Sequence, residues 1–340
     1  MSTSPLRVGI IGVGMMGADH AERVANRISN AELVAVSDPD AERAGQLASR
    51  FAGVRAVGDP LQLIADDGVD AVVIASPGFA HEEQVLACLE HGKYALCEKP
   101  LTMDAASSLR LVEAEAKLGR RRVQVGFMRR FDPEYARMKQ TLDAGTLGRT
   151  LLLHNVHRNK QVPDTFRSEM IVRDSLVHEV DISRWLFGEE IATVTVLSPT
   201  PTSKAAEGVV DPQVAIFTMA GGGIVTTEVF VNNQVGYEVR AEAVSELGTT
   251  TIGMGMGVFT RTANHWGGDI PDDFRFRFGR AYDIEVQEWV NASRRGDVVG
   301  PTTWDGYAAT AVCEAGMASL ASGEPVRVEL ADRTAVEAAS

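Results

Sequence analysis

The sequence predicts an α/β protein of two domains: an N-terminal doubly wound parallel sheet, then an α+β domain with a large open, mostly antiparallel sheet. Three observations support this fold class. Strand-like and helix-like segments alternate over about the first 125 residues, a glycine-rich turn joins the first strand to the first helix, and β-rich runs dominate after Arg129. We therefore expect domains at residues 1–125 and 126–340.

In the first domain, short runs rich in β-branched residues alternate with longer amphipathic stretches. The expected strands are residues 8–13, 33–37, 71–75, 94–97 and 123–125, and the expected helices are residues 18–28, 41–51, 82–91 and 105–118. Such alternation gives right-handed crossovers and a parallel sheet with helices on both faces. This is the Rossmann layout, in which nucleotides bind at the carboxyl ends of the strands.

The second domain has a different pattern. Helices are expected at residues 133–144, 174–187 and 307–321, and strands at 193–197, 213–220, 223–231, 237–243, 249–252 and 326–330. Glycine-containing turns such as residues 221–223 and 247–248 separate neighbouring strands, which indicates a largely antiparallel sheet.

Composition limits the kinds of partner. The chain of 340 residues is 45% hydrophobic and 23% charged, which is ordinary for a globular protein. With 33 basic and 46 acidic residues, its formal net charge is −13. This balance disfavours nucleic acids and membranes as partners and leaves small neutral substrates open. The first residues resemble neither a signal segment nor a membrane span, so we expect a cytoplasmic protein.

Cysteine usage gives no sign of a metal. Cys88, Cys97 and Cys313 lack the paired spacing of a zinc site or of a disulfide framework. We expect reduced, buried thiols and no bound metal ion.

A glycine-rich motif predicts a dinucleotide site. Residues 12–17 (Gly-Val-Gly-Met-Met-Gly) follow a hydrophobic strand and open a helix, which is the context that the G-x-G-x-x-G pattern requires. In this motif Gly12 permits the tight turn, Gly14 lets a pyrophosphate approach the backbone, and Gly17 lets helix and strand pack closely. The helix N-terminus attracts the phosphates, so the loop with Met15 and Met16 is the expected cofactor site.

Asp38 selects the cofactor type. It stands at the end of the second expected strand, where a carboxylate accepts hydrogen bonds from the adenosine ribose and repels a 2′-phosphate. We therefore predict NAD rather than NADP, with nearby Arg43 leaving room for some NADP use. Ser76 and Pro77, which follow the third strand, and His81, near the start of the next helix, are expected to line the nicotinamide side of the cleft.

A second polar cluster lies on a predicted helix. Asp174, His178 and Asp181 are spaced at i, i+4 and i+7, so in an α-helix they share one face within about 60°. A histidine there can take the proton of a substrate hydroxyl, and a nearby carboxylate can orient the ring. A solvated amphipathic face would show the same spacing.

Lys99 is placed to meet a substrate. Glu98, Lys99 and Pro100 directly follow the expected strand at residues 94–97, at the edge of the parallel sheet where ligands bind. The proline restricts the turn, so the lysine side chain is aimed rather than free. Its ammonium group can stabilise alkoxide character on a substrate oxygen as hydride leaves the carbon.

These motifs together resemble the glucose-fructose oxidoreductase / inositol dehydrogenase / rhizopine catabolism (Gfo/Idh/MocA) family, and the resemblance covers essentially the whole chain. The likeness is closest to the inositol 2-dehydrogenase group of that family. The stretches that carry it are Glu98-Lys99-Pro100, residues 126–132, 157–159, 174–181 and 236–240, and Ala281-Tyr282.

The resemblance implies a catalytic triad of Lys99, Asp174 and His178. In it, His178 is the general base for the oxidised hydroxyl, Lys99 binds and polarises the oxygen, and Asp174 orients its partners, while hydride passes to the nicotinamide. Glu98 and Lys99 also count among the expected cofactor-binding residues. The implied substrate-binding residues are Lys99, His157, Asn159, Asp174, His178, Asp181, Tyr237 and Tyr282.

The implied activity is NAD-dependent oxidation of a cyclic polyol, with myo-inositol oxidised to 2-keto-myo-inositol, by a homotetramer. A neutral polyol suits a site with many hydrogen-bond donors and acceptors. A dehydrogenase of another inositol isomer or of a pyranose sugar would use the same face. Two other classes also remain open: an enzyme that retains NAD for glycoside cleavage or epimerisation, and a non-catalytic NAD-binding regulator.

Overall fold

The computed structural model describes residues 4–255 and 260–338, and the chain forms two compact units. The first unit comprises Met1–Met128, Tyr282–Thr310 and Leu330–Ser340. The second comprises Arg129–Ala281 and Ala311–Glu329. Two segments from the carboxyl-terminal part of the chain, Tyr282–Thr310 and Leu330–Ser340, therefore belong to the first unit. The sequence alone indicates instead one continuous second domain over residues 126–340.

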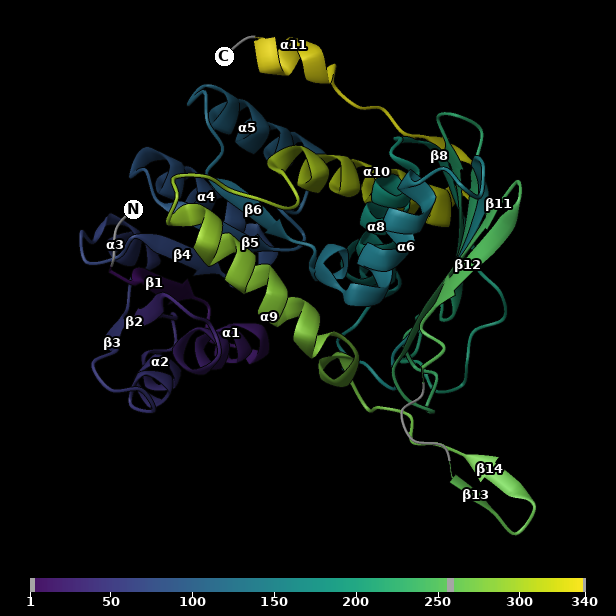
Figure 1. The fold of residues 1–340 in the computed structure, drawn as a ribbon, viewed down its shortest axis with the longest axis horizontal. Coiled ribbons are helices and arrows are strands. Elements are labelled where there is room, and N and C mark those ends of the chain that lie inside the picture. The colour runs from purple at the N-terminus through teal and green to yellow at the C-terminus, as the bar shows by residue number, and fades with distance from the viewer. Residues whose placement is uncertain (1–3, 256–259, 339–340) are drawn as a thin grey trace. The chain divides into compact units, whose positions relative to one another are not determined.

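The first unit contains a six-stranded parallel sheet with the order β3-β2-β1-β4-β5-β6 (Figure 1). Its strands are β1 (Leu6–Ile11), β2 (Ala31–Ser37), β3 (Arg55–Val57), β4 (Ala71–Ile74), β5 (Tyr94–Glu98) and β6 (Val123–Gly126). The strand order reverses next to β1, and nucleotides bind at this switch point in doubly wound sheets. The predicted Rossmann fold is confirmed.

Helices connect these strands. They are α1 (Met15–Asn26), α2 (Ala41–Ala48), α3 (Pro60–Ala65), α4 (His81–Glu90) and α5 (Ala105–Ala116). Two long helices come from later in the chain, α9 (Phe274–Ser293) and α10 (Thr303–Ser322). The second half of α9 buries Val286, Trp289 and Val290 in the hydrophobic core that also contains Ile10 and Leu96.

The second unit contains a seven-stranded sheet with the order β12-β11-β7-β10-β9-β8-β15. Only the β10–β7 pair is parallel, so the predicted mostly antiparallel sheet is confirmed. The strands are β7 (Thr150–Arg158), β8 (Ile191–Leu197), β9 (Gln213–Met219), β10 (Ile224–Phe230), β11 (Glu238–Ser245), β12 (Gly248–Ile252) and β15 (Val326–Arg327). A separate hairpin pairs β13 (Thr260–Thr262) with β14 (His265–Gly267).

Burial alternates along these strands, so the sheet has one covered face and one open face. Leu153, Val225 and Phe217 are on the covered face, where α6 (Pro133–Asp143) and α8 (Val177–Phe187) pack (Figure 1). Arg158 and Glu228 lie on the other face, where they form an ion pair. Polar side chains on the covered face are therefore held in place by the helices that pack there.

The structure contains elements that the sequence did not indicate. Strand β7 places Asn155 and His157 on the covered face, so it lacks the apolar alternation that marks a half-buried strand. Helix α9 begins with alternating phenylalanine and arginine, which is a strand-like period, and contains Gly279. The short elements β3 and α3 offered too few residues for a periodic pattern.

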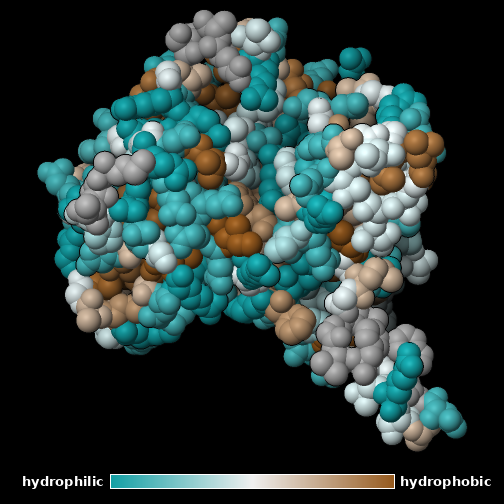
Figure 2. All heavy atoms as spheres, viewed as in Figure 1, coloured by the Kyte–Doolittle hydropathy of each residue, from teal (hydrophilic) through white to brown (hydrophobic). Residues whose placement is uncertain are grey.

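Polar groups cover most of the surface in the view of Figure 2, with isolated hydrophobic patches between them. Phe79, Leu247 and Phe276 are among the large hydrophobic side chains that are mostly exposed. Within the described ranges, no helix combines the length and the apolar character needed to cross a membrane.

Candidate active site

The glycine loop after β1 is tightly packed on its inner side. Gly12 has φ +81°, and a Cβ there would lie 2.5 Å from the backbone nitrogen of Ser76. A Cβ on Gly17 would lie 1.7 Å from the carbonyl oxygen of Gly12. Both positions therefore require glycine, the first for conformation and space and the second for space alone.

The same loop is open at Gly14. An added Cβ there would meet nothing within 4 Å. Gly14 is also the N-cap of α1 and provides no side-chain cap, so the first N–H groups of the helix remain available to a phosphate. Met15, the first helical residue, is exposed. These features fit the pyrophosphate of a dinucleotide.

Asp38 links the end of β2 to this loop. Its carboxylate accepts hydrogen bonds from the backbone N–H of Val13 at 2.8 Å, from the backbone N–H of Asp40 at 2.9 Å and from Arg43 at 2.5 Å. Burial disfavours the charge of Asp38, but Arg43 and these two N–H groups outweigh it and lower its pKa. Asp38 is thus a fixed anion whose lone pairs are largely used by the protein.

His81 contacts the two loops that follow β4 and β5 at the carboxyl edge of the sheet. Its Nδ1 lies 2.9 Å from the carbonyl oxygen of Pro100, and its Nε2 lies 2.8 Å from that of Ser76. Burial lowers the pKa of His81, so the neutral ring donates to one of these two carbonyls. Its ring nitrogens face protein carbonyls rather than a ligand. Ser76 is similarly engaged, since its hydroxyl donates to Gln84 at 2.7 Å, and Pro77 precedes the next helical turn.

Lys99 is half-buried, and the residue before it is fixed by a buried contact. The Glu98 carboxylate lies 2.8 Å from Nε2 of His20, which is fully buried. Burial raises the pKa of Glu98, but His20 and Lys99 outweigh this effect and the net pKa is lowered. Glu98 therefore supports the strand end that carries Lys99.

The helix with Asp174 and His178 is not α-helical throughout. Residues Ile171–Leu176 form a π-helical segment, and α8 begins at Val177. The angular argument from α-helical spacing therefore holds within α8 but not across Asp174. The Asp174 carboxylate accepts two hydrogen bonds from Arg173, at 2.9 and 2.8 Å, while His178 is 8% exposed.

Asp181 has a strong protein partner. Arg130 donates to both of its carboxylate oxygens, at 3.0 and 2.5 Å, and Asp181 is buried. The bidentate geometry fixes the carboxylate and leaves few lone pairs for a substrate hydroxyl.

A buried polar cluster surrounds His157 on the covered face of the sheet. The Arg129 guanidinium forms an ion pair with Glu179, whose other oxygen lies 3.1 Å from Nδ1 of His157. The His157 ring stands edge-on to Tyr237 and to His178, with ring centroids 6.1 and 6.3 Å apart. Burial raises the pKa of Tyr237 to about 12. The second unit thus holds His157, His178 and Tyr237 together.

Two further predicted residues lie in different settings. Asn159 has a buried Oδ1 with no hydrogen-bond partner among the described residues. Such an orphaned acceptor is the kind of group that a substrate hydroxyl would satisfy. Tyr282 belongs to the first unit, where it packs edge-on against His20, with ring centroids 5.9 Å apart, and beneath the Arg23 guanidinium.

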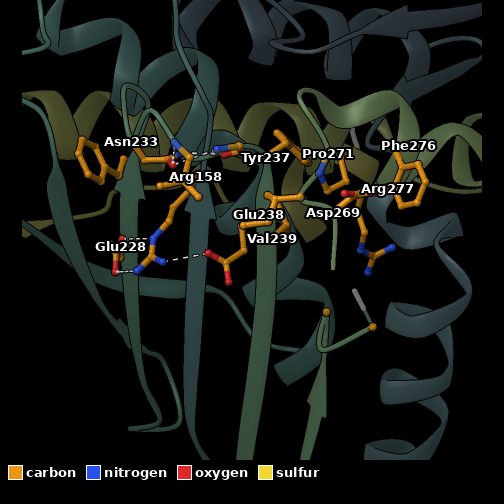
Figure 3. A pocket seen from close by; sticks show the side chains of 16 residues that line it. Arg158, Glu228, Asn233, Tyr237, Glu238, Val239, Asp269, Pro271, Phe276 and Arg277 are labelled. Atoms are coloured by element: carbon orange, nitrogen blue, oxygen red, sulfur yellow. Dashed lines mark hydrogen bonds and ion pairs between the residues drawn. The ribbon is translucent and has the colours of Figure 1, made fainter. Parts of the chain in front are cut away.

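A cavity of about 450 Å³ opens in the second unit near the ends of β7, β10 and β11 (Figure 3). Arg158, Glu228 and Glu238 from the open sheet face line one side, while Pro271 and Phe276 line another. His157, Asp174 and His178 do not line it. Tyr237 does line it, so the cavity shares this residue with the polar cluster, and the rest of its lining comes from other segments of the second unit.

The three cysteines are buried thiols, and burial raises the pKa of Cys88 to about 12. Across residues 4–255 and 260–338, we find no cluster of histidine, cysteine or acidic side chains able to hold a metal ion.

Comparisons with known proteins agree with this fold. A family model described as an oxidoreductase family with an NAD-binding Rossmann fold matches residues 6–127, and the GFO/IDH/MocA C-terminal domain model matches residues 135–251. The chain is 54% identical to inositol 2-dehydrogenase 1 of Mycolicibacterium vanbaalenii, over 99% of this chain and 100% of the relative. It is also 54% identical to inositol 2-dehydrogenase of Mycolicibacterium smegmatis, with the same coverage.

Among solved structures, a myo-inositol dehydrogenase from Lactobacillus casei, in complex with NAD(H) and myo-inositol, superposes with a TM-score of 0.94. It is 33% identical, and the match covers 98% of this chain and 99% of that one.

The fold and the glycine-loop site define an NAD-dependent oxidoreductase. The chain belongs to the GFO/IDH/MocA family, as its sequence motifs indicated, and the relatives named above are inositol dehydrogenases.

Three supporting residues were not identified from the sequence. Glu179 and Arg129 were visible only as parts of the similarity stretches 174–181 and 126–132, and His20 carried no expected role. Their partners lie far away in the chain, at His157 and Glu98. A charged residue on a strongly apolar helix face is the only sequence signal that could have drawn attention to Glu179.

The glycine loop allows a matched pair of substitutions. Gly17→Ala should lower the free energy of unfolding by about 1–3 kcal/mol, because its Cβ meets the Gly12 carbonyl. Gly14→Ala should cost less than about 1 kcal/mol of stability but weaken NAD binding about tenfold or more, since the methyl group would occupy the space of the pyrophosphate. Urea denaturation and calorimetric titration with NAD measure the two effects. Wild-type NAD affinity in Gly14→Ala would contradict the assigned site.

Proposed function

We propose that this enzyme oxidises a ring hydroxyl of a neutral cyclic polyol with NAD, and that its substrate is myo-inositol, giving 2-keto-myo-inositol. The observation that carries the proposal is the buried cluster of His157, His178 and Tyr237 in a chain that also has an NAD-type glycine loop. The names of the similar relatives support the choice of inositol.

In the proposed mechanism, His178 removes the proton from the hydroxyl that is oxidised. His178 is buried, with 8% of its surface exposed, so the transferred proton is held at a defined position. Lys99 donates a hydrogen bond to the same oxygen and stabilises its developing negative charge. Asp174, held by Arg173, orients the site electrostatically. When bound, NAD supplies the acceptor for the two electrons and the hydrogen that leave the carbon.

Recognition of the remaining hydroxyls falls to neutral groups. Asn159 offers an unsatisfied buried oxygen, and His157 and Tyr237 lie on the covered sheet face beside His178. A neutral polyol matches these donors and acceptors, whereas a charged substrate would need a side chain of opposite charge among them. We also include Tyr282 and Asp181 in the proposed substrate site, although Arg130 occupies one lone pair on each oxygen of Asp181 and leaves this carboxylate less to offer a hydroxyl than the neutral groups have.

We also propose a division of labour between the segments of the chain. Residues 1–125 bind NAD, and residues 126–340 bind the substrate and mediate assembly into a homotetramer. The open face of the second sheet supports this assembly, because it carries half-buried apolar residues such as Ile216 on β9 and Phe230 on β10, which pairs with Arg158 on β7.

A substrate panel tests the proposed activity. Purified enzyme should form NADH with myo-inositol at a higher kcat/KM than with scyllo-inositol, chiro-inositol or aldoses, and should prefer NAD to NADP because Asp38 is a fixed anion. NADH absorbance measures this directly. If a glycoside or an epimerisable sugar is converted without net NADH formation, the proposal is wrong and the NAD-retaining class is right.

The role of His178 is tested by replacing it. His178→Ala should lower kcat by about two to four orders of magnitude, because the hydroxyl loses its general base, with NAD affinity unchanged. His91→Ala is the matched control, since His91 is exposed at the end of α4 and should keep full activity. Near-wild-type turnover of His178→Ala would exclude the base assignment.

Assembly is tested by light scattering. The protein should elute with four times the mass of one chain, and Ile216→Lys on the open sheet face should shift it to smaller species by burying an unpaired charge. Leu247→Lys, on an exposed turn, should leave the mass unchanged. A monomeric wild-type protein at assay concentration would rule out the tetramer.

A further inference from the structure

The geometry around His157 points to an unassigned role for Glu179. We propose that Glu179 is a positioning residue that holds His157 in the tautomer with its proton on Nδ1, so that Nε2 accepts a hydrogen bond from a substrate hydroxyl. The inference deepens the proposed function and rests on it for the identity of the ligand, a neutral polyol. The tautomer itself depends only on contacts within the second unit.

Two groups compete for Nδ1 of His157. The Glu179 oxygen Oε2 lies 3.1 Å away, and the Arg129 nitrogen Nη2 lies 3.3 Å away. A protonated Nδ1 donates to the carboxylate, whereas a bare Nδ1 accepts from the guanidinium. Only one of these arrangements can hold at a time, so the identity of the neighbours decides the tautomer.

The carboxylate needs the proton more than the guanidinium needs an acceptor. Glu179 is fully buried, and its other oxygen is bonded to Arg129, so Nδ1 of His157 is the donor available to Oε2. Arg129 outweighs burial and lowers the pKa of Glu179, so the group is charged. Arg129, in contrast, keeps the other Glu179 oxygen as an acceptor whichever tautomer His157 adopts. A bare Nδ1 would leave a buried charged oxygen facing a lone pair.

The arrangement determines what His157 can recognise. With the proton on Nδ1, Nε2 carries a lone pair and accepts from a hydroxyl, while Asn159 presents a second acceptor in its orphaned Oδ1. An acceptor pair of this kind selects ligands that donate, which every hydroxyl of a polyol can do. The same histidine with its proton on Nε2 would instead favour carbonyl or carboxylate oxygens.

Glu179→Gln reverses the tautomer by construction. Arg129 is only a donor, so the amide oxygen of the new side chain must face it, and the amide NH2 group then faces Nδ1 of His157. Nδ1 must become an acceptor and Nε2 must take the proton. The substitution keeps the size of the side chain, so a change in recognition without a change in shape is expected.

Solid-state ¹⁵N NMR of protein labelled at histidine reads the tautomer. The chain has 7 histidines, and the signals lost in His157→Ala identify His157. We expect a protonated Nδ1 in the wild type and a protonated Nε2 in Glu179→Gln. A wild-type protein with the proton on Nε2, or the same tautomer in both proteins, would overturn the proposal whatever the substrate proves to be.

Steady-state kinetics distinguish a Glu179 that positions His157 from a Glu179 that only stabilises the fold. Glu179→Gln should raise KM for the polyol about tenfold or more, because a hydroxyl that donated to Nε2 loses its acceptor. Glu179→Asp, which keeps the charge, should recover part of this loss. In a His157→Ala background, Glu179→Gln should change KM less than about twofold, since its effect passes through the histidine. Equal effects with and without His157 would refute the positioning role.

Glu190→Gln is the structural control. Glu190 forms an ion pair with Arg184 near the end of α8, with hydrogen bonds of 2.6 and 2.8 Å. Like Glu179 it is a carboxylate paired with an arginine, but its partner is not in the His157 cluster. It should leave KM and the His157 signals unchanged. The wild type could oxidise no polyol and yet differ from Glu179→Gln in the His157 tautomer as expected. In that case the proposed function fails and the inference about Glu179 stands.

Discussion

The second unit depends on one buried ion pair, between Arg129 and Glu179. Both side chains are almost fully shielded from water, so each compensates the other's buried charge. The pair lies between the sheet and α8, where an apolar contact would otherwise be expected, and it brings β7 and α8 together through His157. Burial of this kind costs stability compared with hydrophobic packing, and in return it gives the polar side chains around it fixed orientations.

The sequence predicted features that depend on local patterns. The glycine loop, the carboxylate after β2 and each predicted strand or helix of the first 125 residues are marked by residues close together in the chain, and all were found in the expected places. Strand β7 and helix α9 were missed because their residues serve distant partners: inward-facing Asn155 and His157 interrupt one period, and alternating phenylalanines mask the other. Hydrophobic periodicity identifies a buried face only when the buried side chains are apolar. A face that buries polar side chains therefore gives the same sequence pattern as an exposed face.

The candidate site shows the same limit at the level of single charges. The sequence identified Asp38 and Asp181 as carboxylates that could read a ligand, but it could not show that Arg43 and Arg130 lie against them. Neither arginine is distinguishable by spacing from an ordinary surface cation. Tertiary neighbours decide whether a carboxylate is free to bind a ligand or is paired with an arginine of the protein. These neighbours were known only from the structure.

The π-helical segment at Ile171–Leu176 has a consequence for how this region can vary. It accommodates one residue more than an α-helical path would need, so deleting a single residue would restore a regular helix. The wide turn absorbs the additional residue, so the helix on either side would keep its present orientation, but a deletion between Asp174 and His178 would change their spacing from i, i+4 to i, i+3. Substitution of the apolar residues Ile171, Val172 or Leu176 changes only packing, whereas a change in the length of the segment changes the spacing of its polar residues. The spacing between Asp174 and His178 is therefore under a stricter constraint than the identity of the residues between them.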